Sequence, residues 1–478
     1  MMRKLLCILS ASAALLAACN NEQVKEEEQV HAHHGTRYAN EQLTLQHNEG
    51  IAALTFPPVL QPVSRNGQHV TYALTAQKGE MTFVDGITTD TYGYNGNFLG
   101  PVLHLTKGEH VTIQLTNALD EPTTFHWHGL EVAGDATDGG PHAVIEPGVT
   151  ETIDFVVKQQ AATLWYHPHP MGQTAKQVYN GLAGLLYIED DVVRDIPSDY
   201  AVNDFPIVLQ DRTFVDGNIV YEDVANTSST LGDTMMINGV VEPFLTTRNE
   251  PVRLRLLNGS NALTYYLSFS NDMPFQLLAT DGGFLNEPQE MTKLTLGAGE
   301  RAEILVDLTN VADVALMHDD IVVLPIETTG EAVQANYSNT LNEIALPVDV
   351  TTMEPTKHIT MEGMTTNFLL NGQTYDETRI DLRQQRGVTE VWEIENIINE
   401  EGAMAHPFHI HGTQFHVISV NGEAPDASLQ GLKDTVTVQP GQKVRIAVTF
   451  HEVGLYMYHC HILEHEDVGM MGQIEVYE

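Results

Sequence analysis

Cysteine and basic residues are scarce in this sequence. Its 478 residues include 3 Cys, and 23 Lys and Arg stand against 64 Asp and Glu, giving a formal net charge of −41. Nucleic acid and anionic lipid headgroups are poor partners for such a surface, whereas cations, including metal ions, are attracted to it. No internal run reaches the ~18–20 apolar residues of a membrane-spanning helix. We therefore expect no nucleic-acid partner, and the length allows two to four domains.

The one long apolar segment lies at the start of the chain. Arg3 and Lys4 precede an apolar stretch over residues 5–16, and small residues follow. This order is typical of a secretory signal peptide. Residues 16–19, LAAC, resemble the bacterial lipobox, which implies cleavage before Cys19 and lipid on its thiol; plain secretion is the alternative. An acylated Cys19 would tether the protein to a membrane surface without spanning the membrane.

These features divide the N-terminal region into two parts. We expect a lipoprotein signal peptide with its lipobox over residues 1–19 and a flexible, acidic, His-bearing tether over residues 20–39. The protein is then exported and lipid-anchored at a bacterial membrane, facing the periplasm or the cell exterior. Cys460 remains as the one cysteine of the body, so no disulfide framework forms. Its thiol is either an inert core residue or a site of chemistry.

From residue 43 onward the pattern is one of short alternating runs bounded by Gly, Pro, Asn and Asp, which predicts β-strands. HVTIQLTNAL and TEVWEIENII are examples, and each belongs to a longer segment that closes on His-x-His-Gly. PVRLRLLNGS has the same strand and the same Asn but no histidine pair. We therefore predict an all-β protein of three related sandwich or barrel domains. Their expected ranges are 40–195, 200–345 (without metal ligands) and 355–478.

Histidine carries most of the functional information. Four His-x-His pairs occur, at His126/His128, His167/His169, His409/His411 and His459/His461. Residues i and i+2 of a strand point to the same side, so each pair offers two imidazoles to one point. Imidazole is a common ligand of copper, zinc, iron and nickel. Eight imidazoles exceed the needs of one ion, so the pairs predict a metal cluster between the first and the last domain.

The segment YHCHILEHEDVGMM predicts a second metal site. Between His459 and His461, Cys460 faces the opposite side of the strand and therefore belongs to a different centre. His465 and Met470 follow on the same segment, and His406 precedes the third histidine pair. A thiolate, two imidazoles and a weak axial Met form the blue-copper electron-transfer site. The peptide links on either side of Cys460 would then connect this copper to the cluster.

HWHG, WYHPH, HPFHIHG and HCHILEHEDVGMM together resemble the four copper motifs of the multicopper oxidases, in the order found in that family. The resemblance covers essentially the whole mature chain and implies cupredoxin-like Greek-key domains. The likeness is greatest to bacterial three-domain members, namely cuprous oxidases, spore-coat laccases and bilirubin oxidase-like enzymes. All twelve ligand positions are filled, in contrast to the family's cell-division relatives, which keep the fold but have lost copper ligands.

The resemblance implies four coppers per chain and a role for each matching residue. The type 1 copper is assigned to His406, Cys460, His465 and Met470, and the type 2 copper to His126 and His409. One type 3 copper is assigned to His128, His167 and His461, and the other to His169, His411 and His459. Glu466 matches the family's acidic proton donor. Asp138 matches its acid near the type 2 copper, with Asp135 as the alternative.

The family reduces O2 to two waters with four electrons taken singly from reductants. We predict a laccase-like oxidase of phenols and aromatic amines, with Cu(I) as a further candidate reductant. A cuprous oxidase in copper tolerance is the alternative, although the last domain lacks the Met-rich insert of those enzymes. A copper nitrite reductase would share the blue site but would not need eight imidazoles, and a non-catalytic copper-binding lipoprotein would be blue without turnover. The sequence does not indicate an oligomeric state.

Overall fold

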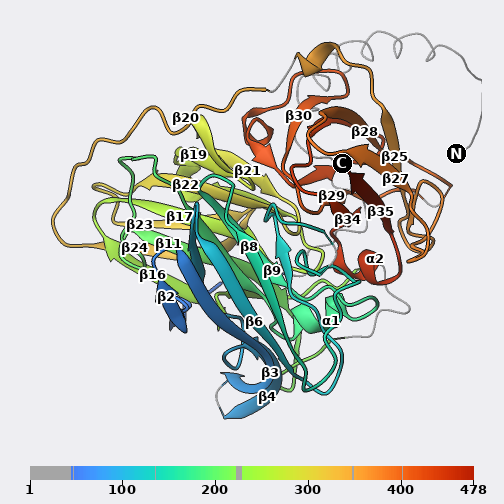
Figure 1. Ribbon diagram of the computed structural model, residues 1–478. Helices are drawn as coiled ribbons and strands as arrows, with labels where there is room; N and C mark the ends of the chain where they lie inside the picture. Colours follow the sequence, from blue (N-terminus) through green and yellow to red (C-terminus); the bar gives the residue numbers. More distant parts are fainter. Residues whose placement is uncertain are drawn as a thin grey trace, which may run out of the picture. The chain divides into compact units, whose positions relative to one another are not determined.

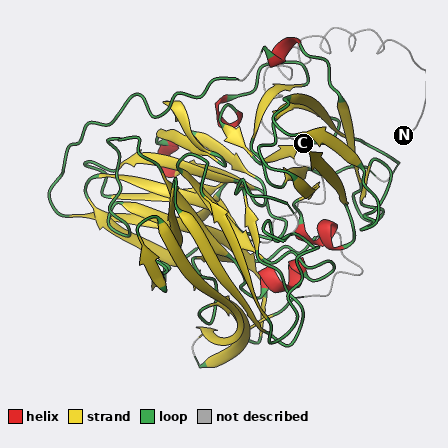
Figure 2. Cartoon of the chain, in the orientation of Figure 1, coloured by secondary structure: helices red, strands yellow, loops and turns green. Residues whose placement is uncertain are grey.

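Short β-strands dominate the chain, as the alternating sequence predicts (Figures 1 and 2). The computed structural model describes residues 45–478, apart from 47, 85, 135, 222–228, 347–348 and 401. The predicted signal peptide and tether, with Cys19, and the alternative acid Asp135 therefore lie outside the described residues. No helix within the described ranges has both the length and the apolar character that crossing a membrane requires.

The first domain consists of two sheets with a shared apolar core. Its elements are β2 (Ser64–Asn66), β3 (His69–Val84), β4 (Ile87–Tyr94), β5 (Leu103–Thr106), β6 (His110–Ala118), β7 (His126–His128), β8 (Thr150–Val156), β9 (Ala162–His167), α1 (Thr174–Tyr179) and β10 (Gly184–Glu189). The strand orders are β2-β3-β6-β8, with β4 on β3, and β5-β10-β9-β7. Exposure alternates along β6, so its apolar residues face the core, as a half-buried strand requires.

The middle domain repeats this architecture with larger sheets. Its elements are β1 (Ala52–Ala53), β11 (Asp204–Arg212), β12 (Phe214–Val215), β13 (Asn218–Ile219), β14 (Thr234–Ile237), β15 (Val240–Val241), β16 (Pro243–Arg248), β17 (Pro251–Asn258), β18 (Tyr265–Phe269), the 3₁₀ turn η1 (Ser270–Asp272), β19 (Phe275–Thr280), β20 (Gly283–Met291), β21 (Lys293–Leu296), β22 (Arg301–Asp307), β23 (Asp313–His318) and β24 (Ile321–Thr329). The strand orders are β1-β16-β24-β23-β18-β21 and β15-β14-β11-β17-β22-β19-β20. Strand β1 thus precedes the first domain in sequence but pairs within the middle one.

The last domain contains the C-terminal strands, coloured orange to red in Figure 1. Its elements are η2 (Val350–Thr352), β25 (Lys357–Glu362), β26 (Leu369–Leu370), β27 (Leu382–Gln385), β28 (Glu390–Asn396), β29 (His406–Ile410), β30 (Phe415–Val420), η3 (Ala427–Leu429), β31 (Leu432–Lys433), β32 (Thr435–Val438), β33 (Lys443–Val448), β34 (Gly454–Cys460), α2 (Leu463–Asp467) and β35 (Met471–Tyr477). The strand orders are β26-β25-β28-β33-β30-β31 and β27-β35-β34-β29-β32. The sheets confirm the predicted all-β architecture.

The internal repeat seen in the sequence has a structural basis. Asn117, Asn258 and Asn396 end corresponding stretches of β6, β17 and β28, and each is fully buried. Each side-chain amide donates to two backbone carbonyls, over 2.7–2.9 Å. A buried amide that satisfies two carbonyls fixes the turn after the strand. The same hydrogen-bonding pattern of a buried asparagine therefore recurs in all three domains.

Two short helices lie where the three domains meet. The Asn261 side chain of the middle domain donates to the Ala175 carbonyl of α1 over 3.0 Å and to Glu464 Oε1 of α2 over 2.9 Å. Asp467 of α2 accepts hydrogen bonds of 2.9 Å from the backbone N–H groups of Thr174 and Ala175. These contacts hold the segments that follow His169 and His461 against each other.

Candidate metal centre

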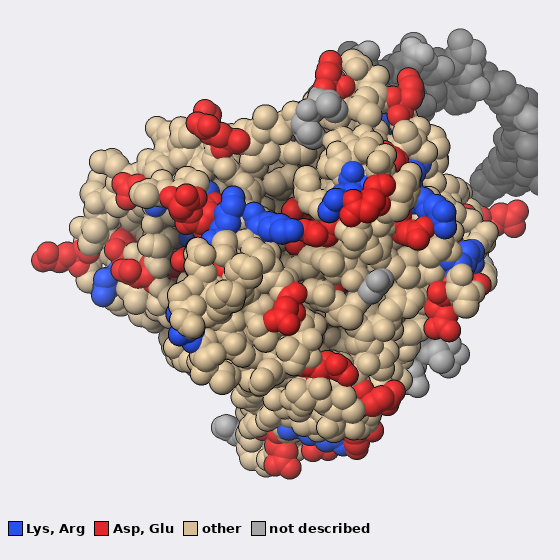
Figure 3. All heavy atoms as spheres, in the orientation of Figure 1, with Lys and Arg blue, Asp and Glu red and all other residues tan. Residues whose placement is uncertain are grey.

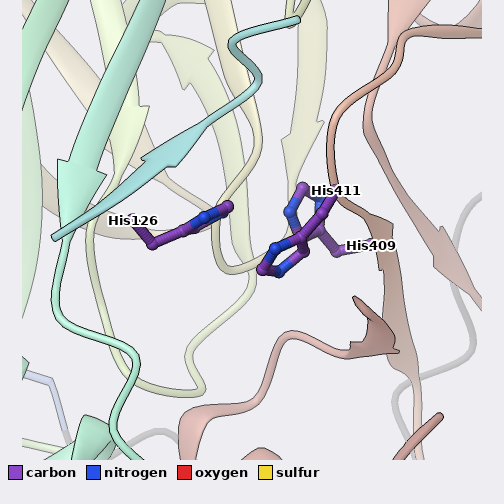
Figure 4. A group of neighbouring side chains, drawn as sticks. All are labelled: His126, His409 and His411. Carbon is purple, nitrogen blue, oxygen red and sulfur yellow. The ribbon is translucent and has the colours of Figure 1, made fainter. Parts of the chain in front are cut away.

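Cross-strand pairing brings the histidine pairs together. In the first domain β7 and β9 are antiparallel, with His126 opposite His167. In the last domain β29 and β34 are antiparallel, with His409 opposite His459. Histidines at alternate positions of these strands turn to one side, whereas Trp127 and Ile410, which lie between the paired histidines, pack into the two domain cores. The chain thereby directs imidazoles from both domains into one space, as Figure 4 shows for His126, His409 and His411.

All eight paired histidines are buried, with at most 1% of any residue exposed. The Nε2 atom of His459 lies 3.0 Å from that of His411 and 3.2 Å from that of His169. This trio matches one predicted type 3 set, and its three donor atoms lie within 4.8 Å of one another. The ring centroid of His461 lies 4.9 Å from that of His128 and 5.5 Å from that of His167, so the second predicted set is also adjacent.

Some close groups of histidines combine residues that are assigned to different coppers. Donor atoms of His126 and His409, the predicted type 2 pair, lie within 4.8 Å of each other and of a donor atom of His411. Donor atoms of His126, His128 and His167 are equally close. The eight imidazoles therefore form one continuous cluster rather than separate pairs, which suits several ions that share neighbouring positions.

The free nitrogens of this cluster fit a metal. Among the described residues no hydrogen-bond partner reaches His126 Nε2, His128 Nδ1, His167 Nε2, His409 Nε2 or either ring nitrogen of His461. Burying a polar atom unpaired costs about 1–3 kcal/mol each. Burial also holds the pKa of His459 at about 3, and it holds the pKa of most of the other cluster imidazoles well below the ordinary value. Neutral imidazoles with inward lone pairs are metal ligands.

Acceptors outside the cluster fix the opposite ring nitrogens. The Asp138 carbonyl accepts from His126 Nδ1 over 3.0 Å, and its carboxylate lies 2.8 Å from His411 Nδ1. Asp434 does the same for two other rings: its carboxylate lies 2.9 Å from His128 Nε2, and its backbone carbonyl accepts from His409 Nδ1 over 2.8 Å. Such partners set the tautomer and ring orientation of metal-binding histidines. Asp138 was predicted to lie at this site and does so; Asp434 was missed, because no histidine spacing points to it.

Glu466 lies against the His169/His459 side of the cluster. It is 1% exposed, and its two carboxylate oxygens lie 3.3 Å from His169 Nδ1 and 3.4 Å from His459 Nδ1. Burial, reinforced by the nearby Asp467 carboxylate, raises the pKa of Glu466 well above its ordinary value. A buried carboxyl group in this position can hold a proton beside the imidazoles.

A second cluster surrounds Cys460 on the opposite side of β34. Its Sγ atom lies 3.4 Å from His406 Nδ1 and 3.4 Å from His465 Nδ1. Met470 is fully buried in the same core, and its carbonyl accepts the Cys460 N–H over 3.1 Å. Burial raises the pKa of the Cys460 thiol, so a thiolate here requires a bound cation. One thiol and two imidazoles at these distances fit copper.

A β-sandwich domain that holds one cysteine between imidazoles defines a cupredoxin-type copper protein. The buried cluster shared by two such domains defines an oxidase of several coppers. Sequence profiles described as multicopper oxidase match residues 75–192, 203–321 and 347–478.

Known proteins of similar sequence and structure include two oxidases and one cell-division protein. Multicopper oxidase mco of Staphylococcus aureus is 49% identical over 436 residues, which cover 90% of this chain and 94% of the relative. The crystal structure of a laccase from Pediococcus acidilactici has a TM-score of 0.86 and 41% identity, covering 91% of this chain and 95% of that one. Cell division protein FtsP of Photorhabdus laumondii is 34% identical, covering 88% of this chain and 92% of the relative.

The chain belongs to the multicopper oxidase family. It binds copper and is a laccase-like oxidoreductase that couples the oxidation of reductants to the reduction of O2. The predicted family, fold and enzyme class are thus confirmed.

Proposed function

We propose that the chain holds four coppers and oxidises phenols and aromatic amines by one-electron steps. The type 1 ligands are His406, Cys460, His465 and Met470. The eight paired histidines hold the other three coppers with the predicted partition. When bound, the coppers supply reversible one-electron redox chemistry and a site for O2.

The contact that carries this proposal is the Cys460 segment. Cys460 lies in the thiol cluster, and His459 and His461, its direct neighbours in sequence, lie in the imidazole cluster. One peptide link on either side therefore joins the two centres. A simple copper carrier would need no such connection, nor eight buried imidazoles.

Carboxyl groups of the chain lie where protons and orientation are needed. Glu466, in contact with His169 and His459, can hold a proton at its carboxyl group and release it toward the interior of the cluster. Asp138 fixes the rings of His126 and His411. The surrounding burial excludes bulk water from both groups.

The test is oxygen uptake by the copper-loaded protein, with copper counted per chain. We expect about four coppers per chain and uptake with a phenol, and both should vanish after chelation and return when copper is restored. One copper per chain, or no uptake with any reductant, would contradict the proposal. A separate run with Cu(I) distinguishes the cuprous oxidase alternative. Figure 3 shows Asp and Glu side chains scattered over the visible side with Lys and Arg among them, and the formal net charge of −41 is compatible with a cationic reductant.

We further propose that the protein is exported and anchored through lipid on Cys19, with the chain facing the periplasm or the cell exterior. The support is the sequence alone, an apolar N-terminal segment that ends in LAAC. We expect Cys19→Ser to move the protein from the membrane fraction to the soluble fraction of its native host. Asn20→Ser is the matched control and should stay with the membrane. Unchanged fractionation of Cys19→Ser would contradict the anchor.

A further inference from the structure

The middle domain, predicted to carry no metal ligand, reaches the imidazole cluster through the turn between β21 and β22. Gly299 in this turn has φ +84°, and a Cβ atom there would lie 2.9 Å from the His461 ring. A side chain at this position would therefore clash with the ring. The turn forms a wall of the cluster without supplying a ligand to it.

Arg301, the first residue of β22, directly follows this turn and is 1% exposed. Its Nη1 and Nη2 atoms donate to the two carboxylate oxygens of Asp434 over 2.7 and 2.5 Å. The remaining N–H groups donate to the carbonyls of Gly299, Asp281 and Thr163 over 3.0, 3.0 and 3.2 Å. All five guanidinium donors are thus used, so the group has a single orientation.

The Asp434 carboxylate carries this orientation to His128, and the backbone of the same residue contacts His409. Its Oδ1 atom lies 2.9 Å from His128 Nε2, and its backbone carbonyl accepts from His409 Nδ1 over 2.8 Å. The two rings stack with centroids 3.8 Å apart. Their other nitrogens, His128 Nδ1 and His409 Nε2, are the ones without a partner in the described chain, and they face the cluster.

Neighbouring charges explain why an arginine stands here. Lys433 pairs with Asp281 over 3.0 Å and with Glu300 over 3.2 Å, and all these side chains are buried. Within the described part of the chain no lysine pairs with the Asp434 carboxylate, and Arg301 supplies its positive partner in two-point geometry. An ammonium group could not hold both oxygens in one plane, because Lys is a point charge rather than a fork.

We propose that Arg301 is a positioning residue of the trinuclear copper centre. Through the Asp434 carboxylate it sets the tautomer and direction of His128, against which the His409 ring stacks, so the copper-free middle domain helps to build the active site. This inference rests on the proposed four-copper arrangement.

The test compares Arg301→Met and Arg301→Lys with Arg194→Met in the copper-loaded full chain. Arg194 is a matched control, since it forms a buried two-point pair with Asp190 and contacts no imidazole in the described structure. The measurements are copper per chain, the type 1 and type 2 electron paramagnetic resonance signals, and the melting temperature. Both Met variants are expected to melt at lower temperature.

For Arg301→Met we expect the affinity for the cluster coppers to fall by about 10–100-fold, the usual cost of losing an outer-shell partner, and copper per chain to fall with it. Its type 1 signal should stay as in the wild type, and Arg301→Lys should recover part of the loss. Arg194→Met should keep all coppers. If Arg301→Met does not fold, a weakened type 2 signal in Arg301→Lys is the expected result instead.

If Arg301→Met keeps the copper content and the type 2 signal of the wild type, the inference is wrong while the proposed function stands. If Arg301→Met does not fold, the same result in Arg301→Lys has the same meaning. A wild-type chain without cluster copper would overturn the proposed function and the inference with it. The copper count of the wild type therefore separates the two failures.

Discussion

Cys460→Ser is expected to abolish the blue colour of the copper-loaded protein and to slow phenol oxidation by more than ~100-fold. Loss of a residue outside the ligand shell can already cost ~100-fold, and Cys460 is a proposed ligand. Cys460 supplies the thiolate of the proposed type 1 site, and it is the one cysteine of the body. A serine hydroxyl is a far weaker ligand for copper than a thiolate. Absorption spectra, copper per chain and oxygen uptake measure the effect.

Met471→Leu is the matched control for this variant. Met471 is buried beside Met470 but is not among the proposed copper ligands, and replacing it with a side chain of similar volume usually costs less than about 1.5 kcal/mol. The control should remain blue and active, while Cys460→Ser should keep about three coppers. Wild-type turnover in colourless Cys460→Ser would show that electrons enter the cluster without the thiol site.

The parts of the site that the sequence predicted are those that depend on local geometry. Alternation along a strand is enough to send His459 and His461 to one side and Cys460 to the other. In the structure Cys460 lies in the core of the last domain, whereas the two histidines face the imidazole cluster. The three-domain fold was predictable for the same reason, since β6 and β28 follow an apolar alternation that needs no knowledge of their partners.

Contacts between domains could not be predicted in this way. Asp434 reaches His128 only because Thr435 pairs opposite His409 in the β29–β32 ladder, and no periodicity specifies that register. Arg301 comes from the middle domain and lies more than a hundred residues in sequence from Asp434 and from Thr163. In sequence it is one more polar residue at the start of a strand. The resemblance pointed to Asp138, which contacts His126 and His411, because it carried tertiary information that the residue pattern lacks.

Glu466→Gln is expected to slow the reoxidation of the reduced enzyme by O2 by about 10²–10⁴-fold, the range for loss of a general acid. The carboxyl group is buried against His169 and His459, and burial raises its pKa, so it can hold a proton where O2 reduction consumes protons. Glutamine has the same shape but cannot release a proton in this way. Stopped-flow mixing of the fully reduced protein with O2 measures this rate, and anaerobic reduction of the blue site by a phenol should be unchanged.

Glu464→Gln provides the comparison, because Glu464 is a buried carboxyl group on the same short helix. Its Oε1 atom accepts a hydrogen bond from Asn261, and residues two apart on a helix do not face each other. A general effect of removing a buried carboxyl would slow both variants alike. If only Glu466→Gln slows reoxidation, the proton comes from the group that touches the imidazoles. If neither variant slows reoxidation, protons reach the cluster by another path. The next residue to replace is then Asp138, which contacts His411.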